Sequence, residues 1–125
     1  MREIKFRGQD YQGKWHYGSL VILTDDYGEL NYFILEGNPE LEIIEPDDFT
    51  LVRPETVGQF IGATDKNNRE IYKGDVVQMN DGRYFTVIFD SYAFLLDGGG
   101  VSYYFNSRDT KEMSVVGNIY DKKIS

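Results

Sequence analysis

Apolar and polar residues alternate along most of the chain, and a period of two is typical of half-buried β-strands. Residues 4–17 alternate in this way on both sides of a turn that contains Gly13. Residues 19–35 form two apolar runs around a second turn, where Gly28 can adopt a positive φ angle at little cost. The pattern predicts two successive β-hairpins, which together make a bent antiparallel sheet.

The second half of the chain continues the β pattern with shorter segments. Residues 56–62 are β-branched and apolar, and their two glycines, Gly58 and Gly62, are predicted to lie in β-bulges. Five further strands are predicted, at residues 75–79, 84–89, 92–96, 101–105 and 114–118. Only the polar stretch between the last two could hold a helical turn, because no apolar pattern of helical period persists anywhere for 10 to 12 residues.

Five short strands within about fifty residues favour a small closed barrel, which hides the strand edges. The SH3-like form is preferred to the OB-fold, because the turn at residues 97–100 leaves no room for a helix. The predicted fold is therefore mainly β, with a bent antiparallel sheet in an N-terminal lobe and a five-stranded SH3-like barrel in a C-terminal lobe. We expect one domain, residues 1–125, with its lobes at residues 1–55 and 56–125.

Charge locates the connection between the two lobes. Of a net charge of −8, most lies in residues 36–55, which contain seven carboxylates and a single basic residue, Arg53. All three prolines lie in the same segment, and proline cannot donate to a sheet ladder. We expect a solvated connection with short edge strands at residues 41–44 and 49–52. So acidic a chain also disfavours non-specific binding to nucleic acid.

Three motifs, in order, carry a family resemblance that spans essentially the whole chain. They are MREIKFRG at the start, TVGQFIGATDKNNREIYKGDVV at residues 56–77 and VVGNIYD at residues 115–121. With them the chain resembles the YopX family of small phage and prophage proteins. The resemblance implies a mostly β architecture with a barrel-like portion and a phage context, and it implies no activity. Family members typically have Asn-Gly where this chain has Asn67 and Asn68; since Asn tolerates left-handed backbone second best, the turn is expected to persist with a small strain.

Residues capable of catalysis or metal binding are few. His16 is the only histidine, and a structural role, solvated or hydrogen-bonded, is favoured because no nucleophile elbow accompanies it. Asp65 begins a segment that fails the EF-hand pattern at most ligand positions. The carboxylates Glu45, Asp47 and Asp48 are interpreted as a solvated acidic loop instead of a cation site. We therefore expect no catalytic residue, no metal and no cofactor.

Two pairs of residues are the binding candidates. In REIYKGDVVQM, residues 69–79, Gly74 permits a tight turn, and Asp75 is expected to accept hydrogen bonds from the amides that follow it. Tyr72 would then close one end of the barrel; the alternative is that Tyr72 and Asp75 form a binding pocket. The second pair is Tyr92 and Tyr104, whose rings are expected to be exposed and could bind a peptide or stack on bases.

Protein contact is favoured over base stacking, because residues 56–125 hold eight basic and nine acidic residues and so form no basic groove. The leading hypothesis is a non-catalytic phage accessory protein that contacts an unknown protein partner and forms a homo-oligomer. The alternatives are a single-stranded nucleic-acid binder and a metal-dependent hydrolase or nuclease using Asp47 and Asp48. No apolar run approaches the roughly 18 residues that cross a bilayer, there is no signal peptide and there is no cysteine, so a cytoplasmic protein of the bacterial host is expected.

Overall fold

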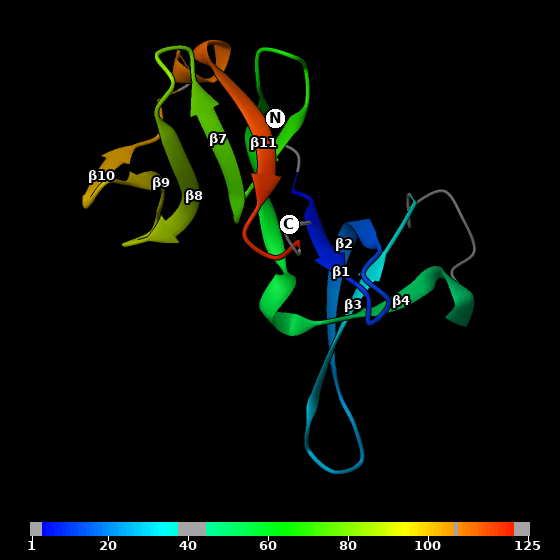
Figure 1. Cartoon of the computed structure of the whole chain (residues 1–125). Coiled ribbons are helices and arrows are strands. Elements are labelled where there is room, and N and C mark those ends of the chain that lie inside the picture. The colour runs from blue at the N-terminus through cyan, green and yellow to red at the C-terminus, as the bar shows by residue number, and fades with distance from the viewer. Residues whose placement is uncertain (1–3, 38–44, 107, 122–125) are drawn as a thin grey trace. The chain divides into compact units, whose positions relative to one another are not determined.

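The computed structural model describes residues 4–37, 45–106 and 108–121, and almost all of its regular structure is β-strand (Figure 1). Its strands form two antiparallel sheets, of six strands in the order β4-β3-β2-β1-β5-β6 and of five in the order β10-β9-β8-β7-β11. The chain divides into two compact units, one formed by the described residues up to Gln59 and the other by those from Phe60. The mainly β prediction is confirmed.

The first unit is built from consecutive strands that pair as neighbours: β1 (Phe6–Gln9), β2 (Trp15–Thr24), β3 (Leu30–Leu35) and β4 (Phe49–Val52). Its fully buried side chains include Ile34 and Val52. Gly8 packs against the second of these so closely that a Cβ atom would lie 2.8 Å from a Val52 methyl group. Strand β5 (Gly58–Thr64) begins in this unit, where Gly58 pairs with Arg7 of β1.

The second unit contains the rest of β5, its hairpin partner β6 (Glu70–Tyr72), and the five-stranded sheet. The strands of that sheet are β7 (Asp75–Met79), β8 (Tyr84–Asp90), β9 (Ala93–Gly98), β10 (Val101–Tyr104) and β11 (Met113–Asn118). One face of the sheet and the β5–β6 hairpin share a core of Ile61, Ile71, Val77, Phe85, Val87, Leu96, Met113 and Val115. The alternation seen in the sequence thus places every second residue of these strands in one core.

The prediction of a closed SH3-like barrel is wrong for the described residues, where the five-stranded sheet is open and has β10 and β11 at its ends. The outer side of β11 is bonded by a turn instead of a strand. The Lys66 amide donates to the carbonyl of Met113 (3.1 Å), and the Val115 amide donates to the Asp65 carboxylate (2.7 Å). Arg69 completes the contact, its Nη1 donating to the Val115 carbonyl (3.1 Å). Because these groups satisfy the β11 edge, it needs no strand neighbour.

A single five-residue turn recurs in four hairpins, at residues 10–14, 25–29, 65–69 and 79–83. In each, the first amide donates to the fifth carbonyl at 2.8–2.9 Å, and the fourth amide donates to the first carbonyl at 2.9–3.1 Å. The fourth residue has positive φ in every case, and it is Gly13, Gly28, Asn68 or Gly82. This is a type I turn followed by a left-handed bulge residue, so the expectation that Asn68 keeps the glycine conformation is confirmed.

Several predicted details can be compared with the structure. Gly62 lies in a bulge, as predicted, whereas Gly58 does not. The predicted helical turn is the 3-10 helix Asp109–Glu112, and two others lie at Pro46–Asp48 and Pro54–Thr56. The strand expected at residues 41–44 lies outside the described residues. Within the described ranges, no helix has the length and apolar character that spanning a membrane requires.

Candidate functional site

The predicted pair Tyr72 and Asp75 is buried, at 2% and 1% exposure. The Tyr72 amide donates to Asp75 Oδ2 (2.7 Å), while the Tyr72 ring packs on Phe60 at 5.5 Å and its hydroxyl donates to Glu70 (3.1 Å). Asp75 therefore accepts from the amide that precedes the turn. The carboxylate ties the end of β6 to the start of β7, so this pair supports the fold and presents no surface to a ligand.

Gly74 explains why this junction is so tightly specified. Its amide donates to the Val87 carbonyl (2.8 Å), and its own carbonyl accepts from the Ile119 amide (3.0 Å). Its φ is +94°, and a Cβ atom there would lie 2.6 Å from the Tyr120 ring. Only glycine satisfies both the conformation and the space, so the Lys-Gly-Asp sequence holds together β6, β7, β8 and the segment after β11.

The second predicted pair, Tyr92 and Tyr104, is exposed, at 98% and 79%. The prediction that Tyr92 begins a strand is wrong. Together with Ser91, Tyr92 forms the two-residue turn between β8 and β9. Both residues have positive φ, 51° for Ser91 and 67° for Tyr92, which is the type I′ geometry that normally selects Asn-Gly. A bulky ring is thus held in solvent by a backbone conformation that costs a tyrosine roughly 1–2 kcal/mol.

Strand β10 ends the sheet, and all four of its residues, Val101 to Tyr104, are exposed. Tyr103 lies on the core face, where its ring meets Phe85 edge-on at 5.7 Å, and Tyr104 lies on the opposite face, as predicted. The Phe105 amide donates to the Phe94 carbonyl of the β9 side (3.2 Å). Because bonding alternates along an antiparallel strand, the amides of Ser102 and Tyr104 point away from β9. We call this outward side of β10, with its rings, the β10 edge.

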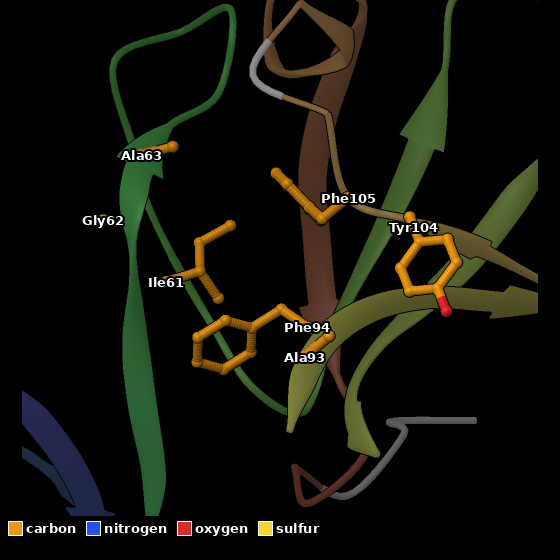
Figure 2. Close-up of a pocket in the computed structure, with 7 residues that line it drawn as sticks. All are labelled: Ile61, Gly62, Ala63, Ala93, Phe94, Tyr104 and Phe105. Carbon is orange, nitrogen blue, oxygen red and sulfur yellow. The ribbon is translucent and has the colours of Figure 1, made fainter. Parts of the chain in front are cut away.

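Two hollows lie beside the β10 edge. The first has a volume of about 320 Å³ and is lined by Ile61, Gly62, Ala63, Ala93, Phe94, Tyr104 and Phe105. Figure 2 shows Ile61, Phe94 and Phe105 pointing toward one another from β5, from β9 and from the segment after β10. The second, about 310 Å³, is lined by Met79, Arg83, Phe85, Leu96, Tyr103, Tyr104, Asn106 and Asp109. Tyr104 is common to both, so the edge strand separates two places where an apolar side chain could insert.

One ion pair lies beside the second hollow, and the carboxylate of Asp97 lies against β10, where it accepts a hydrogen bond from Ser102 Oγ (2.8 Å). Arg83 lies 5.3 Å above the Phe85 ring, and its Nε is 2.8 Å from Asp81 Oδ2. A hydrogen bond from the Arg83 amide, with further help from the guanidinium, lowers the pKa of Asp81. Strand β10 itself contains no charged residue. The strand itself therefore offers backbone groups and rings.

His16 is held between two carboxylates. Its Nε2 lies 2.9 Å from Asp10 and its Nδ1 lies 2.8 Å from Glu36, and both contacts can be donated only by the doubly protonated ring. Burial lowers the pKa of His16, but the two carboxylates outweigh it and the net shift is upward; the bond from His16 is the main cause that lowers the pKa of Asp10 to about 2. His16 therefore has the expected structural role, as a hydrogen-bonded histidine and not a solvated one.

The acidic loop is also used for structure. The Glu45 amide donates to Asp48 Oδ2 (2.8 Å), and the Asp48 amide donates to the Glu45 carbonyl (3.0 Å), so these residues cap the short helix Pro46–Asp48. In the part of the chain that the structure describes, no three histidine or carboxylate side chains gather as ion ligands would.

The sequence reasoning missed two features. One is that Asp65 bonds the β11 edge. The sequence signal was the spacing of Asp three residues before a Gly or Asn, which the turns at residues 10–14 and 25–29 share. The other is a set of apolar side chains exposed on both faces of the β2–β3 hairpin. Its only sequence signal was that residues 20–23 are apolar without alternation.

Fold and site together define a small, mainly β protein, made of two antiparallel sheets, whose exposed candidate site is a strand edge with flanking rings. The chain belongs to the YopX protein family, whose model matches residues 5–123, and the resemblance found in the sequence is confirmed. Among solved structures it is similar to protein EF1440 from Enterococcus faecalis, with 22% identity, a TM-score of 0.62, and coverage of 96% of this chain and 95% of that one. At this identity the likeness shows the fold alone. No curated protein matches the chain.

Proposed function

We propose that this protein is a non-catalytic contact protein of a phage or prophage, acting in the cytoplasm of the bacterial host and self-associating through the β10 edge. The observation that carries the proposal is an unprotected edge strand. Natural edges are usually blunted by lysine, proline or a bulge, and β10 has none of these. The phage setting rests on the family resemblance.

A second copy of the chain is the partner that this edge suits best. Two β10 strands can pair antiparallel about a two-fold axis, with the outward amides of Ser102 and Tyr104 in the new ladder. Neutral residues would then face neutral residues, and residues 60–125 hold eight basic and nine acidic side chains, so little repulsion opposes the approach. Tyr104 would lie at the centre of such an interface, where tyrosines contribute most.

Light scattering after size exclusion, from micromolar to submillimolar protein, tests the proposal. We expect wild type to associate. Ser102→Pro removes an outward amide and the exposed hydrogen bond from Ser102 Oγ to Asp97, leaves the amides of the β9 ladder in place, and should be folded and monomeric. Tyr104→Lys should have the same effect through the lost ring and the added charge. Tyr11→Lys makes the same change at another exposed tyrosine and should associate normally. A wild type that is monomeric throughout, or association that survives both β10 variants, would overturn the proposal.

A further inference from the structure

The β2–β3 hairpin projects beyond the rest of the first unit as an arm (Figure 1). Strand β2 pairs with β1 only up to Gly18, and from Ser19 to Thr24 it pairs with β3 alone. Strand β4 pairs with β3 from Tyr32 to Leu35, so only the pairs Leu23–Asn31 and Thr24–Leu30, with the turn that joins them, have no third strand. We call residues 19–35 the arm. A two-stranded ribbon is marginally stable in water unless another surface covers it.

The arm exposes apolar side chains on both of its faces. The register places Ile22 and Leu30 on one face, and Leu23 and Leu51 of the adjoining β4 on the other, and each of the four is about half exposed. Tyr27, in the turn at the tip, is 92% exposed. A sheet with one face in water normally has polar residues on that face. Here each face combines polar residues with exposed apolar side chains, as is expected of a segment that contacts a partner.

The turn gives the arm a defined shape. Asp25 Oδ1 accepts from the amides of Tyr27 and Glu29, both at 2.9 Å, and Gly28 occupies the left-handed position at φ +80°. Hydrogen bonds from these amides, that of Glu29 being the stronger, lower the pKa of Asp25, so the turn is charged and intact at neutral pH. The apolar residues are therefore held in a fixed arrangement, which reduces the entropy lost on binding.

Charge indicates what kind of surface the arm contacts. Residues 3–59, which make up the first unit, contain twelve carboxylates against four basic side chains, a balance of −8 that equals the net charge of the whole chain. Asp26 and Glu29 add exposed carboxylates beside Tyr27. Two such arms would repel each other, whereas a basic surface would attract one. We propose that the arm docks into an apolar groove rimmed by lysine and arginine on a different protein.

This docking involves neither β10 nor self-association, so it can be tested separately. The probe is a synthetic peptide in which leucine and lysine alternate, followed by methyl and amide NMR of the full chain. We expect shifts confined to the arm, with Ile22, Leu23 and Leu30 moving most. An equally long peptide with glutamate for lysine should not bind, and oligolysine should bind at least tenfold more weakly, because both apolar and charged contacts are needed.

Variants assign the binding to the arm. Leu23→Ser with Leu30→Ser should weaken peptide binding at least tenfold, while the melting temperature shows that the fold persists. Asp26→Lys with Glu29→Lys should weaken peptide binding through the change of charge. Asp47 is an exposed carboxylate in the short helix before β4, outside the arm, and Asp47→Lys should change peptide binding less than twofold. Shifts outside the arm, equal binding of oligolysine, or arm shifts that depend only on protein concentration would each overturn the proposal; the last would identify a second copy as the occupant.

Discussion

Asp65 offers the sharpest test of how this fold is held together. Its buried carboxylate accepts three backbone amides, from Asn67 (2.8 Å), Arg69 (2.9 Å) and Val115 (2.7 Å). In Asp65→Asn, one carboxylate oxygen becomes an amide NH2 group, which donates and cannot accept, so at least one charge-assisted bond is lost. At about 1.5–3 kcal/mol for such a bond, plus the weakening of the other two, we expect a loss of about 3 kcal/mol and a fall in Tm of roughly 10 °C.

The assay is urea unfolding followed by far-ultraviolet circular dichroism, with amide exchange at Val115 as a local measure. Asp25→Asn is the matched control, since Asp25 bonds the same two turn amides but no distant one. It should cost only a small part of what Asp65→Asn costs. If the two variants lose equal stability, or if Val115 exchanges no faster in Asp65→Asn, the role given to Asp65 is wrong.

The same carboxylate has a signature in pH. Burial raises the pKa of Asp65, but the three amide hydrogen bonds outweigh burial, and the folded pKa lies below the ordinary value of 3.8. The stabilisation is therefore complete above about pH 3.8 and disappears as the pH falls through the lowered folded value. Wild type should lose stability over that acid range more steeply than Asp65→Asn does.

Three further outcomes are expected. His16 has a raised folded pKa, so its stabilisation is full below its ordinary value of 6.5 and is lost as pH rises through the folded value; melting curves of His16→Gln should lack this dependence. Tyr92→Gly should raise stability by up to about 1 kcal/mol by relieving left-handed strain, whereas Tyr27→Gly, in a turn residue without positive φ, should lower it. Gly74→Ala should cost about 2 kcal/mol, of which Tyr120→Ala should recover part in a double-mutant cycle.

For each of these three predictions, one result would contradict the reasoning. A His16→Gln protein that still loses stability as the pH rises above 6.5 would show that another group titrates. A Tyr92→Gly protein that is destabilised as much as Tyr27→Gly would show that the turn at Tyr92 is unstrained. If the losses of stability in Gly74→Ala and Tyr120→Ala are additive in the double mutant, the Tyr120 ring is not the cause of the cost at Gly74.

Strands and turns could be predicted because they depend on residues that are close together in the sequence. Alternation located the strands from Asp75 onward to within a few residues, and the position of Gly62 indicated a bulge. Turn residues were equally informative, since only Gly, Asn or Asp readily adopts left-handed backbone. Tyr92 was misplaced for the same reason, because a tyrosine gives no signal of positive φ.

The non-local arrangement could not be predicted. Whether a five-stranded sheet closes depends on whether its two end strands meet, and the Asp65 turn bonds the outer side of β11 instead. Which backbone amide donates to the Asp75 carboxylate depends on the path of the backbone through Gly74, and the order of the residues does not determine that path. Of the candidate site, the exposure of Tyr92 and Tyr104 was predicted, but the hollow beside Tyr104 depends on the packing of residues from three segments.

The recurring five-residue turn has a consequence for the order of folding. Each copy joins strands that are adjacent in sequence, so these hairpins can form early from local contacts. The Asp65–Val115 bond joins residues 50 positions apart and can form only after β11 has reached β7. We therefore expect Asp65→Asn to accelerate unfolding more than it slows refolding, because the Val115 bond forms late whereas the two bonds within the turn form early.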